Sequence, residues 1–236
     1  MVAALIGCYL LAERGHRVGA GVCLGFAMAK PQIAAPFALP FLIAGDFVVL
    51  AAAAGYIVTA LLVVGVVAGL SPLAFIQGWL KYIANAPQWP GYGPYQLLVE
   101  TGMPQPTALS VTAVVIGGIA LVAIVARRRQ PLIVRFAIAA VAARLWSYHQ
   151  LYDNIMLVFL LIAAGEQAIR CRDWRTSITF VAVGATIWMP GRACDIPAFQ
   201  WFQMTVWVIA AITLASGWNT ASPGRQWPAR APAPAT

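Results

Sequence analysis

Apolar runs separated by short polar breaks extend through most of the chain. A helix that crosses a bilayer core of roughly 30 Å needs about 20 apolar residues. The runs Phe47–Leu70 and Ala108–Ala126 meet this length, and the shorter runs Ser177–Met189 and Phe199–Gly217 are also expected to cross. The first run, Val2–Ala12, is too short for a crossing and is interpreted as the end of one that starts upstream.

Two further runs are interrupted, and each predicts either one crossing or a helical hairpin. Val18–Ala44 is broken at Lys30-Pro31, where proline removes a backbone donor and disfavours helix at the residue before it. Pro131–Ile169 is too long for one crossing, and its middle holds the polar run Ser147–Asn154. A hairpin would place each break at a tip between two short helices.

The arginines decide between these alternatives, because cytoplasmic loops are enriched in Arg and Lys. If Val18–Ala44 crossed once from a cytoplasmic Glu13–Arg17, the triplet Arg127–Arg129 would lie outside. If both interrupted runs are hairpins, every arginine cluster lies inside. The clusters are Arg14 and Arg17; Arg127, Arg128 and Arg129; Arg170, Arg172 and Arg175; Arg225 and Arg230. Two hairpins are therefore predicted.

The sequence thus predicts an all-α integral membrane protein, a polytopic bundle of about nine segments, several of them short or paired as hairpins. The N-terminus is expected outside the plasma membrane and the C-terminus in the cytoplasm. Residues 1–220 would form the membrane domain, and the Pro- and Ala-rich residues 221–236 a disordered cytoplasmic tail. The outer face would carry Lys30-Pro31, the loop Ser71–Thr107, the tip Ser147–Asn154 and the loop Pro190–Pro197.

Composition agrees with a membrane protein. Hydrophobic residues make up 61% of the chain and charged residues 9%, and the mean hydropathy is +0.80, whereas soluble domains are about 25% charged. The net charge of +8 does not indicate a nucleic-acid binder, because the basic residues flank apolar runs and form no face with exposed aromatics. The four cysteines lack metal-ligand spacing, so no metal site is predicted.

Smaller features concern the outer boundary and helix contacts. Phe75–Ala84 is expected to be a short helix along the interface, followed by a turn-rich cap that ends at Pro94. The pairs Gly21-x-x-x-Gly25 and Gly65-x-x-x-Gly69 predict close helix approaches. Several aromatic residues form either an interfacial belt or a surface that stacks on a sugar or grips a lipid chain. They are Trp79, Tyr82, Trp89, Tyr92, Tyr95, Trp146, Tyr148 and Tyr152.

Polar side chains at the second tip are candidates for chemistry. If Arg144–Asp153 is helical or nearly so, Arg144, Tyr148 and Tyr152 form one stripe, and His149 and Asp153 a neighbouring one. Together with Lys30 at the first tip, cations and phenols suit a phosphate group, and a His beside an Asp suits proton transfer. A structural alternative remains, in which Lys30 and Arg144 only extend towards water and Asp153 only pairs with Arg144 or His149.

Two stretches carry a resemblance to a known family. They are Gly19-Ala20-Gly21 through Ala29-Lys30-Pro31-Gln32, and Tyr148-His149-Gln150-Leu151-Tyr152-Asp153. Both resemble segments of the GT-C membrane glycosyltransferases, most closely glycosyltransferase family 87, which includes polyprenyl-phosphate-mannose-dependent mannosyltransferases. The likeness spans most of Glu13–Arg175.

The resemblance implies a sugar transfer with inversion, from a polyprenyl-phosphate-linked hexose or pentose to a glycan or glycolipid acceptor on the extracytoplasmic side. Lys30 and Arg144 would hold the donor phosphate, and His149 would assist proton transfer or bind phosphate. Tyr152 and Asp153 would shape the site, to which Tyr148 also belongs. No cofactor is implied beyond this donor substrate.

The chain departs from the GT-C pattern in one respect. These enzymes place an essential acidic residue in the first extracytoplasmic loop, whereas the first acidic residue here is Glu13, which is expected in the cytoplasm. The chain is therefore expected to be the C-terminal part of such an enzyme, working with an N-terminal half, or a shortened relative.

Two other function classes compete with a transferase. A transporter or lipid flippase could use two hairpins as repeats around a substrate site, although such sites usually lie near the bilayer midplane. A membrane scaffold without chemistry is the third possibility.

Overall fold

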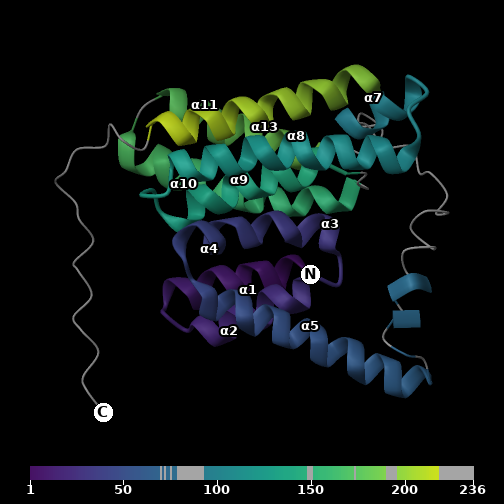
Figure 1. The fold of residues 1–236 in the computed structure, drawn as a ribbon. Coiled ribbons are helices and arrows are strands. Elements are labelled where there is room, and N and C mark those ends of the chain that lie inside the picture. Colours follow the sequence, from purple (N-terminus) through teal and green to yellow (C-terminus); the bar gives the residue numbers. More distant parts are fainter. Residues whose placement is uncertain are drawn as a thin grey trace, which may run out of the picture.

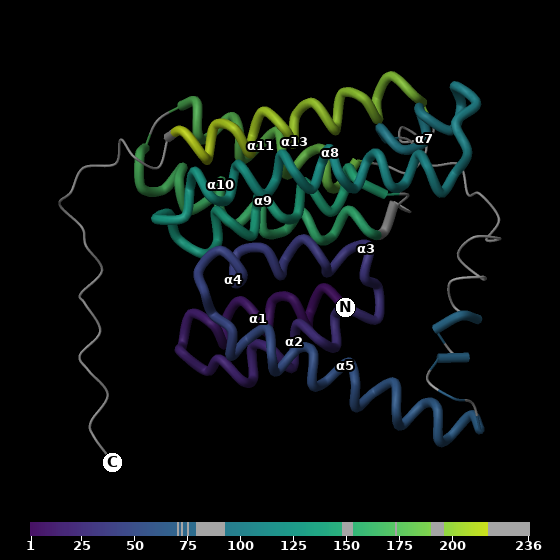
Figure 2. The backbone as a smooth tube through the Cα atoms, viewed as in Figure 1, coloured from purple at the N-terminus to yellow at the C-terminus, as the bar shows by residue number. Residues whose placement is uncertain are grey.

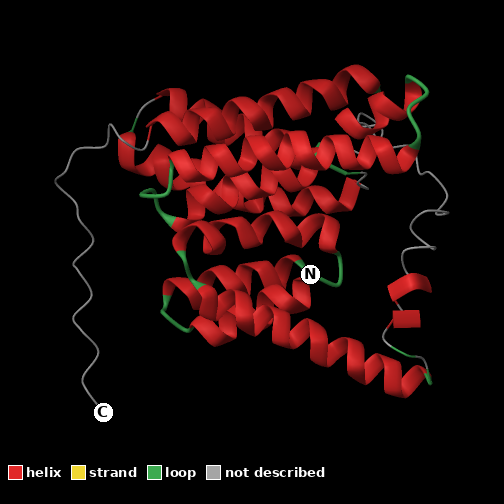
Figure 3. Ribbon diagram, viewed as in Figure 1, coloured by secondary structure: helices red, strands yellow, loops and turns green. Residues whose placement is uncertain are grey.

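The computed structural model describes residues 1–69, 71, 73–74, 76–78, 93–147, 151–172, 174–189 and 196–217. Within these ranges every regular element is a helix, and no strand occurs (Figure 3). The helices are α1 Val2–Glu13, α2 Arg17–Ala27, α3 Pro31–Ala34, η1 Ala35–Ala38, α4 Leu39–Ala44, α5 Phe47–Ala68, α7 Pro94–Glu100, α8 Gln105–Ala126, α9 Leu132–Leu145, η2 Leu151–Leu157, α10 Val158–Cys171, α11 Trp174–Ile187 and α13 Pro197–Gly217.

In the part of the chain that the structure describes, four helical stretches are long and apolar enough to cross a membrane: Phe47–Ala68, Gln105–Ala126, Asp153–Cys171 and Pro197–Ser216. Shorter apolar helices accompany them, and large apolar side chains face outward, as at Val66, which is 83% exposed. A surface of this kind is stable in lipid, because exposing so much apolar surface to water would be unfavourable. The predicted polytopic helical membrane protein is confirmed.

The first predicted hairpin is present. The chain leaves α2 at one end of the bundle, turns at Lys30, and returns through α3, η1 and α4 (Figure 1). The returning segment reaches back to the start of α2, because Nε of Arg17, the first residue of α2, lies 3.5 Å from Oδ2 of Asp46, which follows α4. Pro31 occupies the first turn of α3, a position where its missing N–H costs nothing.

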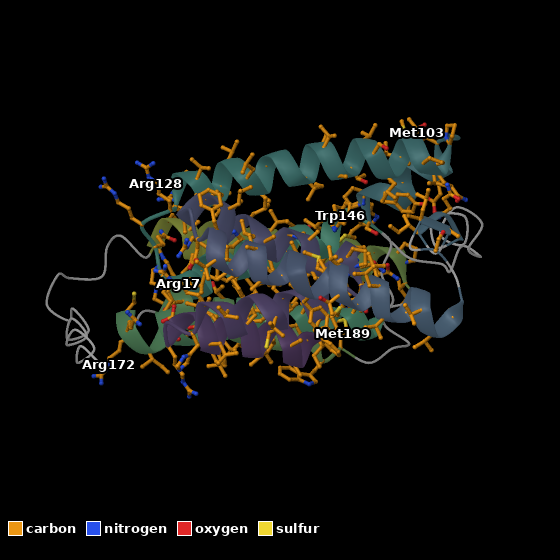
Figure 4. The ribbon with its side chains drawn as sticks, turned by 60° about the horizontal axis from the view of Figure 1, so that its bottom comes forward. Arg17, Met103, Arg128, Trp146, Arg172 and Met189 are labelled. Carbon is orange, nitrogen blue, oxygen red and sulfur yellow. The ribbon has the colours of Figure 1, made fainter. Side chains whose placement is uncertain are left out.

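The second predicted hairpin is also present, between α9 and the continuous pair η2–α10. Arg17, Arg128 and Arg172 lie at one end of the bundle, and Met103, Trp146 and Met189 at the other (Figure 4). We call the first end the arginine-rich end and the second the tip end. The chain therefore passes from the arginine-rich end to the tip end along α9 and comes back along α10.

Helix α9 is the centre of the bundle. All of its side chains except that of Arg135 are buried, as expected of a helix that is apolar all round. Phe136 of α9 packs against Phe37 of η1 and Phe159 of α10, with ring centroids 5.2 and 5.3 Å away. This aromatic cluster joins the two hairpins in the interior, and dispersion and apolar burial stabilise it.

One of the two predicted glycine contacts is confirmed. A Cβ at Gly21 would lie 2.6 Å from Cβ of Ala52, and one at Gly25 would lie 2.8 Å from the carbonyl oxygen of Ala53, so α2 and α5 touch through these glycines. The contact predicted for Gly65 and Gly69 is not seen at Gly69, whose Cβ position has nothing within 4 Å, while Gly65 is buried. Gly69 instead ends α5 with φ +63°, a left-handed cap that glycine adopts at low cost. Past its contact with α2, helix α5 diverges from the other helices (Figure 2).

The expected element limits need several corrections. Pro94 does not end a turn-rich cap but starts helix α7, again as a first-turn proline. Helix α8 begins at Gln105 inside the expected loop, and α11 begins at Trp174, ahead of the expected Ser177. Most of Phe75–Ala84, the loop residues 190–195 and the tail 221–236 lie outside the described residues.

The glycine contact predicts the effect of a single methyl group. Gly21→Ala should lower the free energy of unfolding by about 1–3 kcal/mol, because the new Cβ overlaps Ala52 and the backbone of α5. Thermal or denaturant unfolding in detergent measures the change. Gly55→Ala is the matched control, since nothing lies within 4 Å of its Cβ position. Equal losses for both variants would contradict the packing described.

Candidate functional site

An ion pair joins the tips of the two hairpins. The ammonium of Lys30 donates to Oδ1 of Asp153 at 2.9 Å, across 123 positions of sequence. The Lys30 side chain is 36% exposed, whereas that of Asp153 is 6% exposed. A charge-assisted hydrogen bond of this length fixes the lysine, and the buried carboxylate depends on it for compensation.

The local backbone explains how both residues reach this point. Lys30 precedes proline, which disfavours helix there, and with φ of −121° and ψ of 80° it is the N-cap of α3, three residues after α2 ends at Ala27. Asp153 lies in the first turn of η2, the 3₁₀ helix that leads into α10. Each residue thus stands at a break between two helices of one hairpin.

A buried arginine bonds to the residue that follows Asp153. Arg144, at the end of α9, is 5% exposed, and its Nε donates to Oδ1 of Asn154 at 2.7 Å. Its guanidinium also lies over the ring of Trp207, 5.5 Å from the centroid. Both contacts offset the cost of burying a cation, which is high without such partners.

The same polar region continues to the C-terminal helices. Nε1 of Trp207 in α13 donates to the hydroxyl of Thr186 in α11 at 3.0 Å. Nε2 of Gln203 donates to the carbonyl oxygen of Thr186 at 2.8 Å. Arg144 is therefore held between the second hairpin and the pair α11–α13.

A second tie between the hairpins runs through Trp146. Its Nε1 donates to the carbonyl oxygen of Gln32 in α3 at 2.6 Å. The carbonyl oxygen of Trp146 in turn accepts from the hydroxyl of Thr112 in α8 at 2.6 Å. Because that carbonyl bonds to a neighbouring helix, it contributes to the end of α9 at Leu145.

The structure brings together some of the predicted site residues. Lys30 and Asp153 touch, and Arg144 lies at the same end but bonds to Asn154, the neighbour of Asp153. The structural alternative that paired Asp153 with Arg144 or His149 did not include Lys30. Tyr152 is part of η2, while Tyr148 and His149 lie outside the described residues.

Two interpretations of this region are wrong. The helix α9 does not continue through Arg144–Asp153, because it ends at Leu145 and the next residues, Trp146 and Ser147, are not helical. The predicted stripes include Tyr148 and His149, which lie outside the described residues. Tyr95 does not stand in an interfacial belt, since it is 6% exposed. Trp146 is also more than a belt residue, because its indole bonds to the other hairpin.

Sequence reasoning missed Asn154, Thr112 and Trp207 as parts of this region. Asn154 had a signal, because it closes the polar run and directly follows Asp153. Thr112 and Trp207 had none, since each sits alone in an apolar segment whose neighbours are known only in three dimensions.

The arrangement presents a partly exposed ammonium on a buried, hydrogen-bonded support. Such a fixed positive charge can bind an anionic group and stabilise negative charge that develops during a reaction. Among the described residues, no group of three or more His, Cys, Asp and Glu is placed to hold a metal ion.

Comparison with known proteins identifies a family. The model of glycosyltransferase family 87 matches residues 1–148, which include Lys30, Arg144 and Trp146. Neither the comparison with curated proteins nor the one with solved structures gives a match.

The tie through Trp146 predicts a measurable loss of stability. Trp146→Phe removes the donor to Gln32 and should lower the free energy of unfolding by about 1 kcal/mol. Trp188→Phe is the matched control, because Trp188 is 72% exposed and should change stability by less than about 0.5 kcal/mol. Denaturant unfolding in micelles compares the two, and a smaller loss for Trp146→Phe than for the control would disprove the tie.

Proposed function

The chain belongs to glycosyltransferase family 87, and we propose on this basis that it transfers a sugar from a polyprenyl-phosphate donor to an extracytoplasmic acceptor. The observation that carries this proposal is the Lys30–Asp153 pair, which supplies an anchored cation at the end of the bundle away from the arginine clusters. The sugar would be a hexose or pentose, and the acceptor a glycan or glycolipid of the cell envelope.

The charge distribution supports the proposed sidedness. Arginine-rich ends of membrane bundles face the cytoplasm, because positively charged loops are retained there. The end with Arg17, Arg128 and Arg172 would then be cytoplasmic, and the tip end would face outward across the plasma membrane. In this orientation the N-terminus is outside and the C-terminus inside.

Lys30 suits the phosphate of a lipid-linked donor. An ammonium carries a full positive charge, and the bond to Asp153 fixes its position at the tip end. When the bond between the sugar and the phosphate breaks, negative charge grows on the leaving phosphate. A fixed cation lowers the energy of that charge more than it lowers the energy of the bound donor, which is the condition for catalysis.

The proposed reaction is a single displacement with inversion. The acceptor hydroxyl oxygen forms a bond to the anomeric carbon while the bond from that carbon to the phosphate oxygen breaks, and the bonding electrons remain on the phosphate. His149 would accept the hydroxyl proton, with Tyr148 and Tyr152 contributing phenols to the site.

The test is sugar transfer by the purified protein in lipid nanodiscs. Polyprenyl-phosphate donors that carry different radiolabelled hexoses and pentoses are incubated with lipid and glycan acceptors. Lys30→Met should lower kcat/KM by about a hundredfold, because it removes the positive charge that stabilises the negative charge on the leaving phosphate. Lys30→Arg keeps the charge and should retain more activity than Lys30→Met.

Arg170→Met is the matched control for loss of a cation. Arg170 pairs with Glu166 at an exposed site at the arginine-rich end, so its loss should leave transfer unchanged. Movement of an intact labelled polyprenyl-phosphate sugar across reconstituted vesicles, without transfer to any acceptor, would replace the transferase with a flippase. Full activity in Lys30→Met would refute the role of Lys30.

A further inference from the structure

We infer that Arg144 and Asn154 are positioning residues that hold the tip of the second hairpin so that Asp153 meets Lys30. The inference rests on the proposed function only for its catalytic consequence. It reassigns Arg144, which the sequence suggested as a ligand of the donor phosphate, to a supporting role. Asn154 gains a role that neither the sequence nor the family match indicates.

Burial is the first step of the argument. Arg144 is 5% exposed, whereas the side chain of Lys30 is 36% exposed. A substrate phosphate that arrives from water or lipid meets the exposed cation, and reaching Arg144 would require displacement of Asn154 or of the Trp207 ring. Arg144 is therefore suited to organise protein groups rather than to bind substrate.

The choice of partners is the second step. Nε of Arg144 donates to the neutral amide of Asn154, and the adjacent carboxylate of Asp153 accepts from Lys30. If the arginine bound Asp153 instead, the strongest available acceptor for Lys30 would be lost. Because Asp153 and Asn154 are adjacent, Lys30 and Arg144 each bond to a different one of two neighbouring acceptors.

The backbone of the second tip is the third step. Asp153 and Asn154 lie in η2, and 3₁₀ helices have weaker hydrogen bonds than α-helices, so such a segment relies on side-chain contacts. The bond from Arg144 fixes Asn154 to the end of α9, which is buried at the bundle centre. Because Asp153 is the next residue, fixing Asn154 limits where its carboxylate can lie.

The test measures the chemical reactivity of Lys30 without any substrate. Lys30 and Lys81 are the lysines of the chain, so the peptide that carries Lys30 is easily followed by mass spectrometry. Only an uncharged amine attacks an acylating reagent, and a nearby carboxylate favours the charged form. Asn154→Ala should raise the acylation rate of Lys30 about fivefold, towards the rate in Asp153→Asn.

Two variants separate positioning from general loosening. Asn154→Asp keeps an acceptor for Arg144 and should leave the acylation rate within about twofold of the wild type. Gln130→Leu removes a comparable buried bond, from Nε2 to the carbonyl oxygen of Ala215 at 2.8 Å, at the arginine-rich end. It should leave Lys30 unchanged even if stability falls. Asn154→Ser withdraws the oxygen from Arg144 with less change in polarity and replaces Asn154→Ala if that variant does not fold.

The outcomes are distinct from those of the transferase assay. An unchanged acylation rate in Asn154→Ala, or an equal rise in Gln130→Leu, overturns the inference whatever the protein catalyses. If the wild type transfers no sugar, the proposed function fails, while the acylation rates still decide the positioning role. Where transfer is measured, Asn154→Ala should reduce kcat/KM, and the double variant with Lys30→Met should be no worse than Lys30→Met alone.

Discussion

The ion pair between Lys30 and Asp153 constrains the whole arrangement of the bundle. It can form only if both hairpins turn back at the same end, which also places Arg17, Arg128 and Arg172 together at the other end. Burying a carboxylate is costly, and the bond from Lys30 offsets part of that cost, so an arrangement that separated the tips would lose this contribution. The gathering of Arg17, Arg128 and Arg172 at one end and the ion pair at the other therefore agree with the same two-hairpin topology.

The site depends on this topology because its parts come from distant segments. The exposed cation belongs to the first hairpin, its carboxylate to the second, and the aromatic support of the second tip, Trp207, to α13. Apolar packing of Phe37 on Phe136 and Phe159 holds the hairpins together in the interior, and the polar ties set their register at the tip end. For the proposed polyprenyl-phosphate donor, this register would determine where the phosphate is held.

The sequence was sufficient for the long apolar helices and both hairpins, because run lengths, Lys30-Pro31 and the arginine clusters follow from bilayer thickness and the distribution of charge across it. It did not predict α7, which begins at Pro94 inside the expected loop. It was insufficient for the contacts within the site. The bond of Arg144 to Asn154 depends on α9 ending at Leu145, and that end involves Thr112 on another helix. Pairing across helices is a property of packing, and a helical periodicity extended through the tip could not supply it.

The most direct measurement is a double-mutant cycle on the free energy of unfolding, with Lys30→Met, Asp153→Asn and the two combined. Each single change leaves one member of the pair without its partner, whereas the double change removes both charges. The combined loss should be smaller than the sum of the single losses by at least about 1 kcal/mol. Losses that add to within about 0.5 kcal/mol would show that the two side chains do not interact, and the shared tip would be contradicted.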